Sequence, residues 1–151
     1  LLMIDDVLVP SGFNMTSFLT QMQRSEFDTA STAIAGQTVH DQMRPTKSCS
    51  ARSVTFVDIM FTVFTHTAWS CWQKSIDIST NRYGWGNDIT YPQTCSAAVG
   101  ILNRHIVSHP LNHTKQGRTY DGKGAKSQMM AWLKLHNTSI VKGATVRCIA
   151  S

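Results

Sequence analysis

Histidine is the residue whose type and spacing in this chain most readily support chemistry. His105 and His109 are four residues apart, and on a helix this spacing places two side chains on one face, as in many zinc sites. The glutamate of a zinc-hydrolase motif is missing, because Ile106 and Val107 stand between the two histidines. We therefore expect no metal and no cofactor. If the protein is an enzyme, the expected proton carriers are His66, His105 and His109.

Carboxylates are poor candidates for catalysis in this sequence. Asp5 and Asp6 are neighbours near one end, and Glu26 is the only glutamate. Acid–base chemistry by two carboxylates needs a pair held on either side of a substrate bond. No such pair is evident along the chain, and a nucleophile elbow of the type G-x-S-x-G is also missing. These observations favour a binding function over an enzymatic one.

A basic, glycine-rich segment is the first candidate binding site. Flexible backbone with free N–H groups and cationic side chains can hold a phosphate or sulfate group. Nucleic acid is disfavoured as a partner, because base stacking needs several aromatic side chains among the cations and this segment has one. The expected binding residues are Lys115, Arg118, Tyr120, Lys123 and Lys126.

A second candidate binding site is the aromatic sequence Tyr83-Gly84-Trp85-Gly86. Trp and Tyr combine a large apolar face with a polar group, so they serve both cores and recognition surfaces. An aromatic residue between two glycines is poorly placed for a core. We expect Tyr83 and Trp85 to contact a glycan or a protein surface.

The four cysteines are far apart in the sequence, and no two form a C-x-x-C pair. Zinc sites usually contain close ligand pairs, whereas an even number of distant cysteines is typical of disulfides in secreted domains. Of the three possible connectivities we prefer Cys71–Cys95 with Cys49–Cys148.

Three Asn-x-Ser/Thr sequences support the same extracellular setting. They predict glycosylation at Asn14, Asn112 and Asn137. The predicted location is therefore secreted, extracellular or on a virion surface.

The composition indicates a folded basic domain. Apolar residues make up 42% of the 151 positions and charged residues 15%, against about 25% in an average domain, and the net charge is +5. Most of the positive excess follows Arg104, which favours anionic partners. The most apolar stretch contains an acid and two threonines, so we expect no membrane span.

The hydrophobic pattern predicts a mixture of strands and helices. Predicted strands cover 1–9, 53–66, 72–78 and 139–150, the second of them central. Predicted helices cover 14–35 (ending near Phe27), 95–108 and 127–136. Predicted loops cover 36–52, 81–92 and 111–126.

These elements predict a single domain over residues 1–151 of the α+β class. We expect a mostly antiparallel sheet, two or three short helices and two disulfides. An all-β sandwich is the alternative.

The predicted function is a secreted or surface-exposed, disulfide-stabilised glycoprotein domain that binds a polyanion, a glycan or a protein partner. A small secreted hydrolase that uses histidine, with or without zinc, is one alternative. A structural protein such as a virion or coat component is the other, and the sequence leaves an oligomer open.

Overall fold

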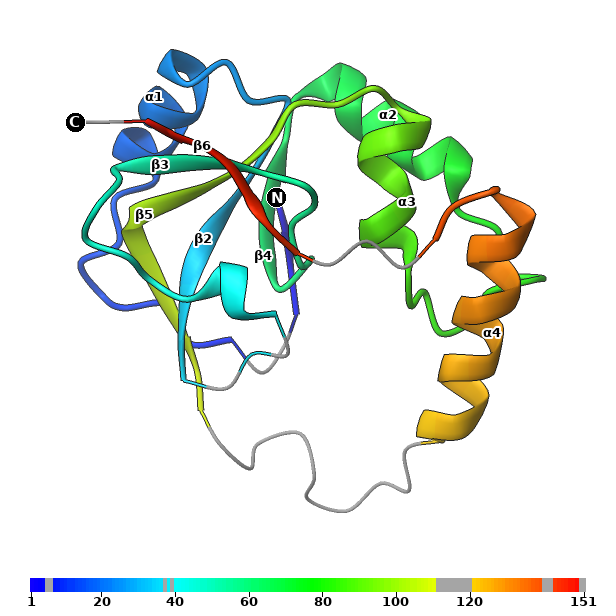
Figure 1. The fold of residues 1–151 in the computed structure, drawn as a ribbon. Coiled ribbons are helices and arrows are strands. Elements are labelled where there is room, and N and C mark those ends of the chain that lie inside the picture. Colours follow the sequence, from blue (N-terminus) through cyan, green and yellow to red (C-terminus); the bar gives the residue numbers. More distant parts are fainter. Residues whose placement is uncertain (5–6, 37, 39, 111–120, 140–142, 150–151) are drawn as a thin grey trace.

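One mixed β-sheet forms the centre of the computed structural model (Figure 1), which describes residues 1–4, 7–36, 38, 40–110, 121–139 and 143–149. Its strands lie in the order β1–β4–β2–β5–β3–β6. Strands β2 and β5 are parallel, and each other neighbouring pair is antiparallel. The strands are β1 (Leu2–Met3), β2 (Thr29–Gly36), β3 (Ala51–Val54), β4 (Phe61–Phe64), β5 (Val99–His109) and β6 (Thr145–Ile149).

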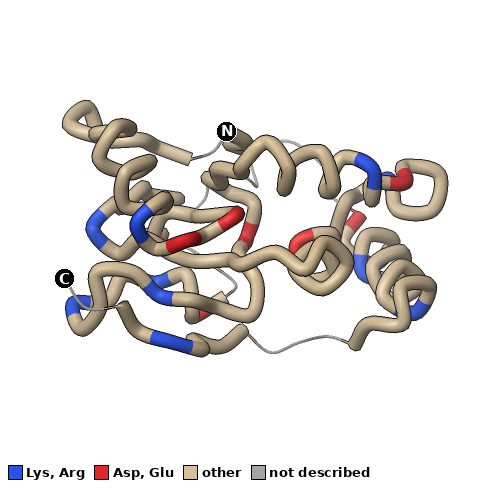
Figure 2. The backbone as a smooth tube through the Cα atoms, turned by 90° about the horizontal axis from the view of Figure 1, so that it is seen from above, with Lys and Arg blue, Asp and Glu red and all other residues tan. Residues whose placement is uncertain are grey.

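The helices form two groups, which lie at opposite ends of the molecule. Helix α1 packs against β5, whereas α2 packs against β4 and α3. Figures 1 and 2 show α2, α3 and α4 together at one end of the molecule and α1 at the other. The helices are α1 (Met15–Arg24), α2 (His66–Ser75), α3 (Asn87–Thr94) and α4 (Gly122–Leu135), with a short 3₁₀ helix η1 (Asp41–Met43).

Helix α1 forms within the segment predicted to be helical, with a cap and one apolar face. The Asn14 side chain accepts a hydrogen bond from the Ser17 N–H (2.8 Å) at its start. Phe18 and Met22, four residues apart, are buried, so the helix covers the sheet with one stripe. It ends at Arg24, earlier than the predicted end near Phe27, and Glu26 then adopts a positive φ of 56°.

Residues 95–108, predicted to be a helix, form most of strand β5 instead. Val99, Leu102 and Ile106 have helical spacing, but Ile106 is exposed whereas His105 and Val107 beside it are buried, which is the alternation of a strand. The parallel pairing with β2 overrides the local helical pattern.

The predicted strand 53–66 is divided into two strands that lie on opposite sides of the β2–β5 pair. Strand β3 pairs with β5 and β6, and β4 pairs with β2 and β1. The residues between them form a loop that buries Phe56 and Val57. The prediction of one continuous strand was wrong because burial in a loop produces the same apolar run as burial in a strand.

The predicted strand 72–78 is wrong, because these residues begin inside helix α2. The Thr65 hydroxyl caps this helix by accepting a hydrogen bond from the Ala68 N–H (3.3 Å). Ala68 and Trp72, one turn apart, are the buried residues of the helix.

The predicted loops 81–92 and 111–126 both end in helices. Helix α3 begins directly after Gly86, and α4 begins at Gly122 because the Asp121 side chain accepts a hydrogen bond from the Gly124 N–H (2.8 Å). Lys123 and Lys126 therefore lie on a helix and not in a loop.

Two disulfides join the elements. Cys49–Cys148 ties the segment before β3 to β6, and Cys71–Cys95 ties α2 to the end of α3. These are the pairs expected from the sequence.

The architecture confirms the α+β class and excludes the all-β sandwich. The sheet is larger than predicted, and α-helices number four in the described residues. Among those residues no helix has both the length and the apolar character needed to cross a bilayer.

Candidate functional site

The segment 81–88, which we call the aromatic loop, is held in one conformation by a buried amide. Asn81 is 2% exposed, and its Nδ2 donates to the Trp85 carbonyl (2.9 Å) and to Asn87 Oδ1 (3.2 Å). Gly84 and Gly86 have φ values of 72° and 87°, a region that favours glycine. The loop is therefore fixed by its own hydrogen bonds before any ligand arrives.

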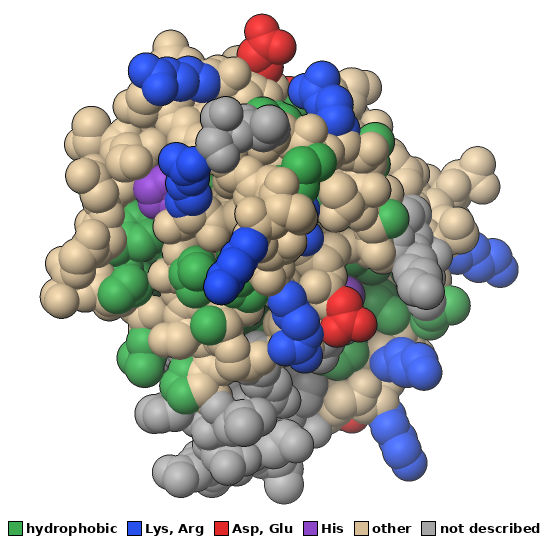
Figure 3. Space-filling model, turned by 60° about the vertical axis from the view of Figure 1, so that its left-hand side comes forward, with side chains coloured by type: hydrophobic (Ala, Val, Ile, Leu, Met, Phe, Trp, Pro, Cys, Tyr) green, Lys and Arg blue, Asp and Glu red, His purple; other side chains and the backbone are tan. Residues whose placement is uncertain are grey.

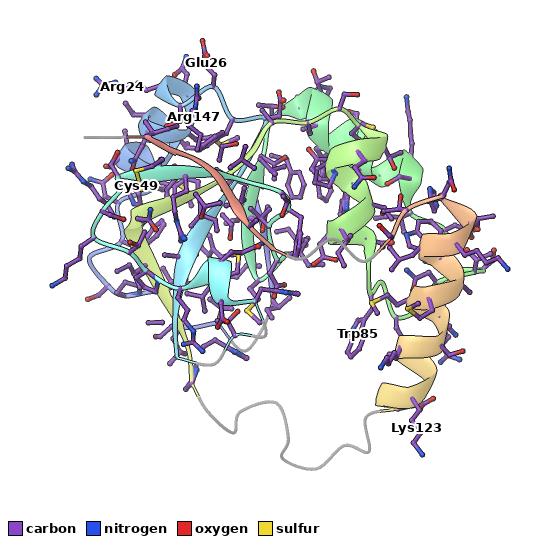
Figure 4. All side chains as sticks on the ribbon, viewed as in Figure 1. Arg24, Glu26, Cys49, Trp85, Lys123 and Arg147 are labelled. Carbon is purple, nitrogen blue, oxygen red and sulfur yellow. A yellow bond between two sulfur atoms is a disulfide. The ribbon has the colours of Figure 1, made fainter. Side chains whose placement is uncertain are left out.

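Trp85 and Tyr83, both predicted to bind a ligand, have different surroundings in this loop. Trp85 is 41% exposed and projects from the loop before α3 on the side of the sheet (Figure 4). The Tyr83 hydroxyl donates to Asp121 Oδ2 (3.3 Å), and the Arg82 guanidinium lies 5.5 Å from the centre of its ring. Trp85 is thus partly exposed at the surface, whereas Tyr83 ties the loop to α4.

Among the described residues, the carboxyl group of Asp88 in the first turn of α3 has the pKa that lies furthest from its ordinary value. Removal of water from around its carboxyl group raises its pKa from 3.8 to about 7, and the negative charge of Asp58 contributes to the rise. Hydrogen bonds from the backbone N–H groups of Ile89, of Asp88 itself and of Gly86 act in the opposite direction. The bond from Gly86 places the carboxyl group beside the peptide that follows Trp85.

The charge of Asp58 acts on Asp88 because the loop before β4 and the start of α3 contribute to one small core. Phe56, two residues before Asp58, and Ile89, next to Asp88, are buried together with Leu133 of α4. The Asp58 carbonyl accepts a hydrogen bond from Thr62 Oγ1 (3.1 Å), which fixes the loop at the start of β4. The two carboxylates therefore lie at the border of a water-poor cluster.

Nothing in the sequence indicated this electrostatic coupling between Asp58 and Asp88. Desolvation and the nearby charge of Asp58 both disfavour the ionised form, so Asp88 is protonated in about half of the molecules near pH 7. A carboxyl group with a pKa near 7 can both donate and accept a proton at physiological pH. Sequence reasoning missed both residues, although an acid inside the apolar stretch 54–64 was a signal for Asp58.

The candidate histidines do not form one site. Strand β4 pairs Phe64 with Thr29, the first residue of β2, and His66 follows directly in α2. His109 pairs instead with Gly36 at the far end of β2. His66 and His109 therefore lie at opposite ends of the sheet.

His105 has the surroundings of a core residue. It is buried on β5, and its ring lies 5.3 Å from that of Phe18 and 5.6 Å from that of Phe13. Burial lowers the pKa of His105, which keeps the imidazole neutral at physiological pH.

The remaining predicted residues are spread over the surface or fall outside the description. Lys123 and Lys126 are exposed on α4, and Asn14 and Asn137 are exposed at the ends of α1 and α4. Outside the described residues lie Asp5, Asp6, Asn112, Lys115, Arg118 and Tyr120. In the described part of the chain, no three or more His, Cys, Asp or Glu side chains converge as metal ligands would.

Fold and site together define a disulfide-linked α+β domain with a carboxylate pair beside an exposed tryptophan. Residues 11–145 match the family described as protein of unknown function (DUF707), and the chain belongs to that family. No curated protein matches the chain, and no solved structure does.

Proposed function

We propose that this protein is a secreted, disulfide-stabilised domain that binds a glycan at the aromatic loop and processes it with the Asp58–Asp88 pair. The observation that carries this proposal is the position of Asp88: a carboxyl group with a pKa of about 7 next to the peptide that follows an exposed tryptophan. A perturbed carboxyl group of this kind is a candidate catalytic acid or base.

The aromatic loop supports a sugar as the ligand. One face of a sugar ring carries C–H groups and packs on an indole ring, while its hydroxyls need polar partners nearby. Trp85 supplies such an indole, and Asp88, in the first turn of the helix that follows, supplies a polar group. Because Asn81 already fixes the loop, little conformational entropy is lost on binding.

The pair supports transfer of a glycosyl group as the reaction. Protonated Asp88 gives its proton to the leaving oxygen as the bond from the anomeric carbon to that oxygen breaks. Ionised Asp58 accepts the proton of the attacking hydroxyl, from water or from a second sugar, as the new carbon–oxygen bond forms. One proton enters and one leaves the pair, so the pair ends the step with the same charge.

The two disulfides support an extracellular location, because such bonds persist in oxidising compartments. The exposed sequon residues Asn14 and Asn137 fit the same location. A hydrolase that uses His66 with His105 or His109 receives no such support, because His105 is a core residue and His66 and His109 lie at opposite ends of the sheet.

The test combines binding with product analysis. Wild-type protein is applied to a glycan array, and the bound glycans are incubated with it and analysed by mass spectrometry. Trp85→Ala should remove binding that Trp85→Phe retains, and Asp88→Asn should bind without forming product. Binding that is unchanged in Trp85→Ala would reject the site, and unchanged product formation in Asp88→Asn would reject the catalytic role.

A further inference from the structure

A groove on the opposite side of the molecule from Trp85 has a lining suited to an anionic ligand. It lies between α1 and β5 and has a volume of about 750 Å³. Arg24 and Arg104 line it, and around them Ser17, Thr20 and Gln21 contribute hydroxyl and amide groups. None of the lining residues is acidic.

The two arginines are available to a ligand. Both are exposed, and neither forms an ion pair with another of the described residues. A guanidinium group presents several N–H donors in a plane, which matches the oxygens of sulfate, phosphate or carboxylate groups.

A smaller pocket of about 240 Å³ continues this groove and shares Ser50 and Arg104 with it. Lys47 adds a third cation there. Asn103, which is 5% exposed, lines the same pocket. Its Nδ2 donates to the Cys49 carbonyl (3.1 Å), but its buried Oδ1 has no hydrogen-bond partner among the described residues. Because this oxygen has almost no accessible surface, Asn103 forms part of the pocket wall and not a contact for a ligand.

The surface around both pockets is basic. Figure 3 shows Lys and Arg side chains spread over the side of the molecule that lies at the left in Figure 1, with a few Asp or Glu side chains among them. In Figure 4, Arg24 of α1 and Arg147 of β6 lie at the same corner of the molecule, with Trp85 on the other side. The cations come from four separate segments of the chain, so their convergence is a property of the fold.

We infer that this groove, from Arg24 through Arg104 to Lys47, is a second binding site, for an anionic glycan bearing sulfate or carboxylate groups. The cations match its charged groups, whereas the hydroxyl and amide groups of Ser17, Thr20 and Gln21 match its sugar hydroxyls. Single-stranded nucleic acid fits less well, because the groove lacks the Phe, Tyr or Trp side chains on which bases stack. The site does not depend on the proposed reaction, since it shares no residue with the aromatic loop.

The experiment uses a heparin-derived oligosaccharide as the probe and isothermal titration calorimetry at physiological salt. Arg24→Ala/Arg104→Ala should weaken binding by about tenfold or more, because two charge-assisted contacts are lost. The matched control is Lys74→Ala/Lys134→Ala, which removes the same charge from exposed positions on α2 and α4 and should change affinity by less than about twofold. Thermal unfolding of each variant checks that the fold is retained.

Three results would overturn the inference. Equal losses in the two double variants would show general attraction to a basic protein. Tighter binding of single-stranded DNA of matched charge would reassign the groove to nucleic acid, and absence of saturable binding would remove the site. Trp85→Ala should bind the probe as wild type does, so failure here is distinguishable from failure of the proposed function.

Discussion

The negative charge of Asp58 raises the pKa of Asp88, although β4, α2 and most of the aromatic loop separate the two in the sequence. They meet because Phe56 and Ile89, close neighbours of each, pack in one cluster with Leu133. The pKa of Asp88 thus depends on the packing of segments that are distant in the sequence.

Replacement of Asp58 by asparagine should lower the pKa of Asp88 from its value of about 7, because a like charge disappears. The pKa should stay above 3.8, since burial is the larger cause and is unchanged. Carboxyl ¹³C NMR titration measures it directly. Asp77→Asn removes the same charge from a position that does not contribute to the pKa of Asp88, and it should leave that pKa unchanged. A pKa of Asp88 that is equal in wild type and Asp58→Asn would contradict the coupling.

Replacement of Asp88 itself should alter the pH dependence of stability. The folded pKa of about 7 exceeds the ordinary value of 3.8, so between these pH values the folded state holds a proton that the unfolded state has released. The contribution of Asp88 to the stability of the wild type therefore falls as pH rises through this window. An asparagine side chain does not ionise and keeps an oxygen acceptor for the backbone N–H groups, so Asp88→Asn should gain stability relative to wild type from pH 4 to pH 8.

Urea unfolding at pH 4, 6 and 8 tests this expectation. Asp77 is the control, because hydrogen bonds from Ser79 and Thr80 lower its pKa in the folded state. The stabilisation that Asp77 contributes is therefore present above the unfolded pKa and is lost as pH falls. The free energy of unfolding of Asp77→Asn should accordingly not rise relative to wild type toward pH 8. An Asp88→Asn difference that is constant with pH would exclude the raised pKa.

The two disulfides should differ in their contribution to stability because they close loops of different length. The residues of Cys49–Cys148 are 99 positions apart, and those of Cys71–Cys95 are 24 apart. Loop-closure entropy then gives about 4.7 and about 3.4 kcal/mol. Replacing both cysteines of each pair by alanine should therefore cost more for Cys49–Cys148 in denaturant unfolding. A larger loss for Cys71–Cys95 would show that local packing, not chain entropy, dominates.

Sequence reasoning succeeded where the signal was local or covalent and failed where tertiary contacts decided the outcome. The start of α1 carries its own cap in Asn14, and cysteine number and spacing led to both disulfides. Strand β5 was missed because its pairing with β2 outweighs a helical pattern. The Asp58–Asp88 pair and the Arg24–Arg104 groove join segments whose proximity no spacing rule encodes.

Gly100 provides a direct test of the packing that replaced the predicted helix by β5. A Cβ atom at this position would lie 2.0 Å from the Phe27 ring, closer than any real contact. Phe27 is buried in the hydrophobic core, so its ring cannot move without disturbing the packing around it. Gly100→Ala should therefore lower the free energy of unfolding by about 1–3 kcal/mol. Gly12→Ala, where the added atom meets nothing within 4 Å, is the matched control and should change it little. Equal stability of the two variants in urea would contradict the close approach of β5 and Phe27, and with it the placement of residues 99–109 in the sheet.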